Sequence, residues 1–201
     1  MQKSAQNDFP VHELIRERWS PRSFADEPVP QNVLRSLFEA ARWAASSYND
    51  QPWSYLVATR DDGANHSKML SVLMDMNAAW AKQAPVLVIS VARQNFKHNG
   101  TRNRVALHDL GAANAQLTFE ATSRGLVVHQ MGGFHQDKAR ELFGIPDGWE
   151  PVSAMAIGYP GDPEALPEQL RTPEKAPRTR KPLSEFVMSG HWGHTASFIK
   201  K

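Results

Sequence analysis

The 201-residue sequence contains no cysteine. This absence excludes disulfides, thiolate nucleophiles and cysteine-ligated zinc together, and it leaves the redox compartment undetermined. No stretch approaches the roughly 18 consecutive apolar residues of a membrane span. Residues 1–8 are polar and lack the apolar region of a secretory signal. We therefore expect no membrane segment, and a cytoplasmic protein is the simplest interpretation.

The sequence also lacks a strong excess of one charge. Lys and Arg total 23 against 21 Asp and Glu, which gives a formal net charge of +2. Nucleic-acid binding is therefore not expected, since it would rest on residues 171–181 alone and would show as strongly salt-dependent binding to oligonucleotides. Hydrophobic residues make up 41% of the chain, which is typical of a globular protein with one sizeable core.

Familiar catalytic and metal-binding motifs are missing too. There is no Gly-x-Ser-x-Gly elbow, Walker loop or Gly-x-Gly-x-x-Gly string. The close pairs among the eight histidines are His129 with His135 and His191 with His194, and neither pair has a carboxylate at ligand spacing, so no metal site is predicted. His108 and Asp109 are adjacent on a predicted helix and should not face each other, which makes them a surface pair. We expect a bound cofactor to carry the chemistry, and we predict no catalytic side chain in the protein.

Apolar periodicity gives a coarse secondary structure. Helices are predicted over residues 11–19, 34–44, 69–82, 102–124 and 136–143. Short β-prone runs predict strands over residues 55–59, 86–91, 126–130 and 152–158. Small residues at 111–115 should let another helix approach the longest helix closely. Strands alternating with helices predict an α/β or α+β layered sheet.

The composition changes after Pro160. Six of the 14 prolines fall between Pro160 and Pro182, so we divide the chain into a core, residues 1–160, and a proline-rich C-terminal arm of the same domain, residues 161–201. The arm still carries large apolar side chains, namely Leu183, Phe186, Val187, Trp192 and Phe198. A pure linker would not carry so much apolar area, so this segment is either a loose tail or an arm that lies on a second subunit.

Four stretches carry polar groups that suit a phosphate or a heteroaromatic ring. They are residues 18–24, 45–53, 129–134 and 178–183. Arginine presents a fixed fork of donors to phosphate, small hydroxyls and amides can bond a ring edge, and paired glycines let backbone N–H groups approach a planar ligand. The third stretch also ends a predicted strand, where layered sheets commonly bind ligands. Each stretch alone also fits a solvated surface, a polar loop, a simple turn or a basic tail.

The same stretches contain four motifs in a fixed order, from about Val11 to Leu183. They read Arg18-x-Ser20-x-Arg22-x-Phe24, Ser46-Ser47-x-Asn49-x-Gln51-Pro52-Trp53, Gly125-Leu126 followed by Gly132-Gly133-Phe134, and Arg180-Lys181-Pro182-Leu183. Each motif is weak alone, but four in register resemble the FMN-dependent nitroreductase family. The resemblance implies a homodimer with an α+β fold, a mixed sheet flanked by helices, and a C-terminal arm exchanged between subunits.

The resemblance also implies the chemistry and the partners of the site. Two FMN molecules would lie at the dimer interface, each contacted by both subunits. NAD(P)H would reduce FMN, and a small acceptor such as a nitroaromatic or a quinone would reoxidise it by a ping-pong mechanism. The alternatives are an FMN-binding protein or flavin carrier with little turnover, and a specialised flavin dehydrogenase or dehalogenase-like enzyme. Rapid bleaching of bound flavin by NAD(P)H would separate an enzyme from a carrier.

Site residues carry over by position in the motifs. The candidate cofactor-binding set is Arg18, Trp19, Ser20, Arg22, Ala45, Ser46, Ser47, Asn49, Gln130, Met131, Gly132, Gly133, Arg178 and Arg180. The resemblance implies that Arg18 and Ser20 hold the phosphate and ribityl region with Arg180 and Arg178. Arg22 would lie near the flavin pyrimidine edge, with Asn77 as a further candidate there.

Two further groups of the set have implied roles as well. Residues 45–49 would reach the ring from the partner subunit, and the backbone at 130–133 would reach the flavin N5 side. Many relatives have proline where Ala45 stands, and some carry extra helices where this chain is short, between Pro85 and Arg102. We therefore expect an open pocket, or one covered by partner residues such as Trp80 or Phe96.

Overall fold

The computed structural model describes residues 3–199. Residues 1–2 of the predicted core and residues 200–201 of the predicted arm lie outside the described residues. Four strands form one sheet in the order β1-β2-β4-β3. Their bounds are Trp53–Thr59 (β1), Val86–Arg93 (β2), Val127–Met131 (β3) and Trp149–Gly158 (β4). Every pairing is antiparallel. The predicted α+β class is confirmed, but the sheet is not mixed, because β4 lies between β2 and β3 and runs opposite to both.

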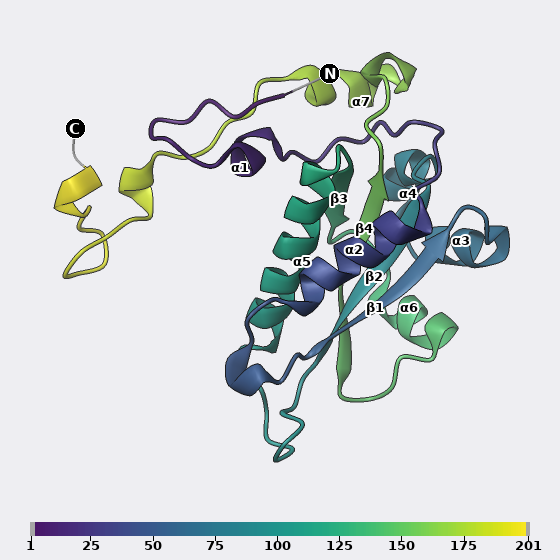
Figure 1. The fold of residues 1–201 in the computed structure, drawn as a ribbon, viewed down its shortest axis with the longest axis horizontal. Coiled ribbons are helices and arrows are strands. Elements are labelled where there is room, and N and C mark those ends of the chain that lie inside the picture. The colour runs from purple at the N-terminus through teal and green to yellow at the C-terminus, as the bar shows by residue number, and fades with distance from the viewer. Residues whose placement is uncertain (1–2, 200–201) are drawn as a thin grey trace.

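Helices cover both faces of this sheet (Figure 1). They are α2 (Gln31–Arg42), α3 (Gly63–Leu70), α4 (Asp75–Ala81), α5 (Ala106–Ser123) and α6 (Gln136–Phe143). Alternate residues of β2 serve the two faces: Val86 and Val88 pack with α2 and α5, whereas Leu87 and Ile89 pack with α3, α4 and α6. The continuous branched run of β2 is thus a strand buried on both faces, as predicted.

The predicted close approach to the longest helix is also found. Small and apolar side chains of α5, including Ala113 and Ala121, pack against Leu37 and Ala41 of α2 in one buried cluster. Gly125 follows the helix with φ +76°, a conformation that glycine adopts without steric cost. The sequence reasoning placed both this helix and its end correctly to within a few residues.

The helix predicted over residues 69–82 is instead two helices, α3 and α4. Between them, the Val72 carbonyl accepts from the His135 amide at 2.8 Å, and the Met74 amide donates to the Gly133 carbonyl at 3.1 Å. Leu73 forms a bridge with Phe134. These backbone groups bond across the molecule and cannot also continue a helical ladder. Because of this break, α4 begins beside the residues that follow β3.

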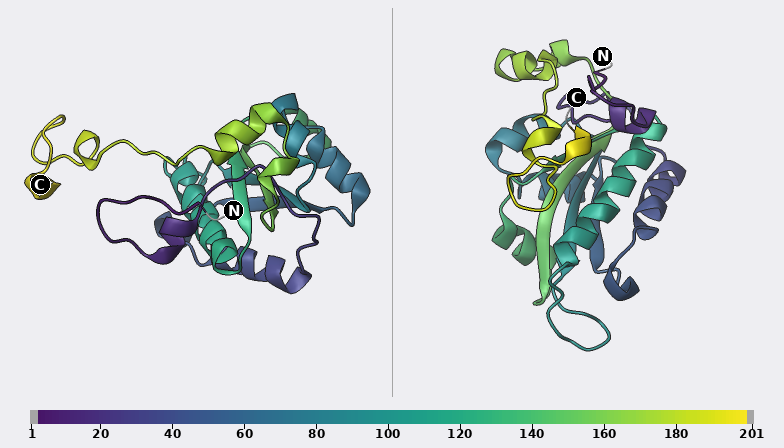
Figure 2. Two further views of the ribbon diagram at one scale, coloured as in Figure 1. Left: turned by 90° about the horizontal axis from the view of Figure 1, so that it is seen from above. Right: turned by 90° about the vertical axis from the view of Figure 1, so that its left-hand side faces the viewer.

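The N-terminal and C-terminal segments lie close together on the body. The short α1 (Glu13–Glu17) replaces the predicted longer helix. After β4, η2 (Pro163–Ala165) and α7 (Glu168–Lys175) pack onto the core, where Leu166 is fully buried. The chain beyond α7 extends away from the body with η3 (Leu183–Glu185) and η4 (Ser197–Ile199), as Figure 2 shows. None of the helices within residues 3–199 is long and apolar enough to cross a membrane.

Candidate functional site

Two side chains, the half-buried His129 and the buried Glu174, hold residues 18–22, which we call the arginine loop. His129 on β3 donates its Nδ1–H to the Pro21 carbonyl at 2.9 Å. Burial lowers the pKa of His129 despite that hydrogen bond, which keeps the ring neutral at ordinary pH. On the other side, Glu174 Oε1 accepts from the Arg22 amide at 2.7 Å and from the Ser23 amide at 3.3 Å. The loop backbone is therefore clamped between β3 and α7.

Three guanidinium groups gather beside this loop. Burial, followed by the positive charges of Arg178 and Arg180, lowers the pKa of Arg18, which shows that the three cations lie close together. Arg18 Nη1 lies 3.1 Å from Ser20 Oγ, and Arg178 Nη1 donates to the Arg16 carbonyl at 2.8 Å. Within residues 3–199, no carboxylate lies in ion-pair distance of any of the three. Burial, followed by the charge of Arg180, lowers the pKa of Arg178, although the charge of Glu17 opposes this shift. Three like charges held this close together fit the phosphate of a nucleotide cofactor.

The end of β3 offers a ligand backbone rather than side chains. Gly132 has open space where a Cβ would stand, so a planar ligand could approach its backbone. A Cβ on Gly133 would lie 2.6 Å from Asn77 Nδ2, so any side chain there would displace the Asn77 amide. Asn77 Nδ2 donates to the Gly133 carbonyl at 2.9 Å. Gln130 is exposed, whereas the Met131 side chain is buried in the core, so Met131 can offer only its backbone.

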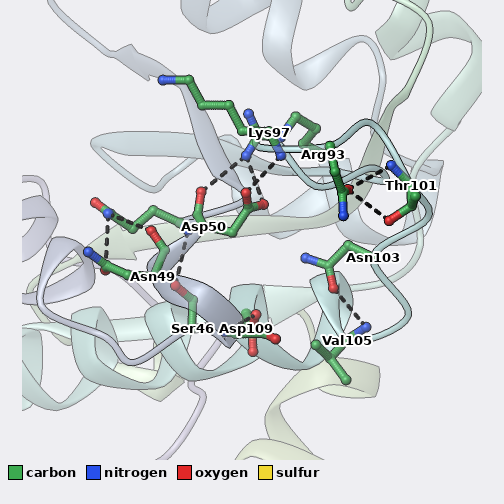
Figure 3. A network of polar contacts seen from close by, with 12 residues as sticks. Ser46, Asn49, Asp50, Arg93, Lys97, Thr101, Asn103, Val105 and Asp109 are labelled. Atoms are coloured by element: carbon green, nitrogen blue, oxygen red, sulfur yellow. Dashed lines mark hydrogen bonds and ion pairs between the residues drawn. The ribbon is translucent and has the colours of Figure 1, made fainter.

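The second group of candidates lies in residues 45–51, which we call the serine loop. Tyr48, Asn49 and Gln51 have φ of +55°, +52° and +47°. Non-glycine residues in this region are strained, and they persist only where surrounding contacts impose them. The Ser47 amide donates to Asp109 Oδ2 at 3.0 Å. The Gln51 amide donates to Ser46 Oγ, also at 3.0 Å, which closes the loop (Figure 3).

The Asp50 side chain holds the end of the serine loop in place. Its side chain is 2% exposed and accepts from the Lys97 amide and from Arg93 Nη2, each at 2.8 Å (Figure 3). Burial alone would raise the pKa of Asp50, but these donors outweigh it and lower the pKa. The loop borders a hollow of about 580 Å³. Tyr48 presents its ring there, with ring centroids 5.6 Å from Phe96 and 5.3 Å from His98.

Two expectations from the sequence are wrong. His108 Nδ1 lies 3.1 Å from Asp109 Oδ1, so these neighbours do face each other. The short Asp109 side chain, 5% exposed, turns inward from the first turn of α5 to meet the serine loop, and the exposed His108 ring can reach it. Trp80 is 2% exposed and packs between Phe24 and His129 in the core, so it cannot cover a partner's pocket.

Two supporting residues went unrecognised in the sequence. Glu174 lies in a proline-rich segment that resembles solvated surface, and no local pattern reveals its burial. Asp109 had one usable signal, because an acidic residue in the first turn of a helix often bonds backbone N–H groups. Across the described residues, no three His, Asp or Glu side chains group as a metal site.

The arginine loop and the serine loop lie at opposite ends of α5 (Figure 1). Arg18 and Trp19 border a hollow shared with Thr122 and Gly125, at the C-terminal end of this helix. Ser47 instead bonds Asp109, near its N-terminal end. About 13 positions separate Asp109 from Thr122, which corresponds to roughly 20 Å along the helix axis. The arginine half (arginine loop, Arg178 and Arg180) and the serine half (serine loop) therefore lie apart within one chain, and the end of β3 lies between them, where Gln130 Nε2 donates to Thr118 Oγ1 at 3.3 Å.

Comparisons with known proteins identify the family of this chain. A crystal structure of an oxidoreductase containing FMN superimposes with a TM-score of 0.90 at 34% identity, over 94% of this chain and 96% of that chain. The FMN reductase [NAD(P)H] of Bacillus subtilis is 31% identical over 189 residues, 83% of this chain and 71% of that protein. An uncharacterized 15.4 kDa protein of Mycolicibacterium smegmatis is 35% identical over 125 residues, 62% of this chain and 83% of its own length. Residues 15–159 match the model of the nitroreductase family. The chain therefore belongs to the nitroreductase family.

Proposed function

We propose that two copies of this chain share FMN sites and move a hydride from NAD(P)H to a small acceptor, such as a nitroaromatic or a quinone, by a ping-pong mechanism. The chain is an NAD(P)H-dependent flavin oxidoreductase whose cofactor is FMN. When bound, FMN supplies the two-electron chemistry, so no side chain has to act as a nucleophile.

The arginine half would hold the phosphate end of FMN. Arg18, Arg178 and Arg180 offer three charged donor groups that lie close together. Arg22 lies on the same loop, where a cation would stabilise negative charge at the pyrimidine edge. The open backbone at Gly132 would let the ring approach the end of β3.

The serine half would reach the ring from the second copy. The observation that carries this proposal is the distance of roughly 20 Å along α5 between the two halves, since one chain cannot close the site alone. The extended segment after α7 supports the same assembly. Its Phe186, Trp192 and Phe198 side chains are exposed, and an arm laid on another subunit would bury them. We propose that residues 161–201 supply this arm, with α7 as its anchor on the core.

The hollow beside the serine loop would take the acceptor. The rings of Tyr48 and His98 line it, with Phe96 packed against both, and planar aromatic compounds stack on such rings. Phe96 was the expected cover for a partner's pocket, and its contact with Tyr48 supports that role. Because the hollow lies in the serine half, it would lie over the flavin held by the other subunit.

The absorption spectrum of the purified protein tests the function. The protein should show a bound-flavin spectrum that anaerobic NADH or NADPH bleaches, and a quinone or a nitroaromatic should restore it. Flavin that binds but bleaches slowly would indicate a carrier instead. A colourless protein that takes up no added FMN would contradict the proposal, and the arginines would then be solvated surface.

A further inference from the structure

We propose that Glu174 is a positioning residue that fixes Arg22 and offsets its charge, and that it thereby sets the reduction potential of the bound flavin. This inference rests on the proposed function, because it places Arg22 beside FMN. Neither the family match nor the motif residues assign Glu174 any role. Glu174 is a buried carboxylate on α7, and the contacts of its side chain lead to the arginine loop.

Glu174 reaches the arginine loop with both carboxylate oxygens. Oε1 takes the backbone amides of Arg22 and Ser23, and this fixes the direction in which the Arg22 side chain leaves the loop. Oε2 lies 3.5 Å from Arg22 Nη1, which makes an ion pair with the same residue. One carboxylate therefore controls both the backbone and the charged end of Arg22.

The ion pair is loose on the side of Glu174. The Glu174 side chain is 1% exposed, and its Oε2 atom is buried without a hydrogen-bond donor. A buried charge with one unsatisfied oxygen is costly, and such groups tend to serve a purpose beyond anchoring. The Arg22 side chain is about one-third exposed, so part of it is accessible to a ligand. Arg22 thus links a buried anion to the accessible surface of the protein.

Glu174 forms the ion pair with Arg22, and a second carboxylate, Glu17, acts on Arg178 through its charge and opposes the lowering of its pKa by burial. The other cations of the arginine half are Arg18, Arg178 and Arg180, and the Lys3 ammonium donates to the Glu174 backbone carbonyl. Reduced FMN carries more negative charge than oxidised FMN, so nearby cations favour the reduced form. A buried anion behind Arg22 opposes them, because charges inside a protein are poorly screened. Glu174 should therefore hold the potential more negative than Arg22 alone would.

The variant Glu174→Gln separates the charge of Glu174 from its shape. Glutamine keeps an acceptor oxygen for the two backbone amides and nearly the same shape, removes the negative charge, and places an NH2 group where Oε2 met Arg22. The matched control is Glu168→Gln on the same helix, where the carboxylate is 79% exposed and bonds only Arg171 and Thr172. Both variants are measured as FMN-loaded full chains, by redox titration of the flavin and by FMN dissociation constants, with circular dichroism as the test of folding.

We expect Glu174→Gln to favour reduced over oxidised FMN by about tenfold, a shift of about 30 mV to a more positive potential for a two-electron couple. Glu168→Gln should leave the potential unchanged. If Glu174→Gln keeps its flavin and its fold but matches the control, Glu174 is only an anchor and the inference is wrong. A wild-type chain that binds no FMN would overturn the proposed function itself, which is a different outcome.

A double variant, Arg22→Gln with Glu174→Gln, covers the case in which the single variant does not fold, because it leaves neither charge buried alone. In this proposal Arg22 lies nearer to the flavin than Glu174 does. Losing both charges therefore removes the positive charge that acts on the flavin more strongly. The potential should then fall below the wild-type value. A double variant that is more positive than wild type, or unchanged, would contradict the assignment.

Discussion

The two halves of the site are both held by buried carboxylates, but they are built in opposite ways. The arginine half joins segments far apart in the sequence, and its loop has no strained backbone. The serine half is one short loop whose backbone is strained at three residues. Glu174 clamps the first, whereas Asp109 and Asp50 clamp the second.

Because of this difference, each half of the site should be disrupted by a different change in the chain. The arginine half depends on where α7 and the following residues lie, so it should fail when the C-terminal segment is lost. The serine half depends on local contacts that hold strained residues in place, and it should survive the same loss. The predictions below act on one half at a time.

The largest effect should follow truncation after Lys175. This change keeps α7, and with it Leu166 and Glu174, on the core, but it removes Arg178, Arg180 and the exposed aromatic side chains of the arm. We expect FMN binding and dimerisation to fall below detection, by flavin content and analytical ultracentrifugation. A truncated chain that stays dimeric and flavin-loaded would show that the segment is a loose tail.

Arg180→Ala should weaken FMN binding without unfolding the chain. Removing one charge-assisted hydrogen bond costs about 1.5–3 kcal/mol, which corresponds to a dissociation constant roughly 10- to 150-fold higher. The matched control is Arg35→Ala, because Arg35 is exposed on α2 and outside both halves. Fluorescence titration of the apoprotein with FMN measures both. Equal dissociation constants for the two variants would remove Arg180 from the site.

The serine half should show its clamp in the pH dependence of stability. The pKa of Asp50 is lowered in the folded chain from its usual value near 3.8, so its contribution is fully present above that pH. It is lost as the pH falls through the lower folded value. Asp50→Asn should cost about 1–2 kcal/mol at pH 7, and its deficit against wild type should shrink below about pH 3.8. Urea unfolding at pH 7 and pH 3 measures this, and a constant deficit would contradict it.

The smallest effect concerns the strain itself. Tyr48→Gly should leave the free energy of unfolding equal or raise it by up to about 1 kcal/mol. Glycine adopts positive φ without strain, which stabilises the folded chain, but it also makes the unfolded chain more flexible, which offsets part of that gain. Tyr48 is 82% exposed, so little packing is lost. The KM for aromatic acceptors should nevertheless rise, while Tyr48→Phe should change neither quantity. Thermal unfolding that shows Tyr48→Gly to be clearly less stable would mean that the ring, not the backbone, holds the loop.

The sequence alone predicted the family and most of the sheet. The family is confirmed by the match over residues 15–159, and each predicted strand overlaps an observed one. These features were accessible because branched runs and motif spacing are local properties of the chain. The roles of the individual cofactor-binding residues stay predictions.

What the sequence could not predict depends on distant contacts. The helix break at residues 71–74 arises because Leu73 pairs with Phe134, which no local periodicity records. Glu174 is buried only because the arginine loop, about 150 positions earlier, covers it. The antiparallel sheet likewise follows from β4 entering between β2 and β3. Tertiary pairing decided each of these points.

Subunit complementation tests the shared site most directly. One variant, Arg18→Ala with Arg180→Ala, breaks the arginine half. The other, Ala45→Trp, blocks the serine half at an exposed position with little effect on the fold. Neither homodimer should bind FMN. After the two are mixed and allowed to exchange subunits, each heterodimer regains one intact site, so roughly a quarter of all sites should bind FMN. A mixture that binds no more FMN than its parents would contradict a site built from both halves.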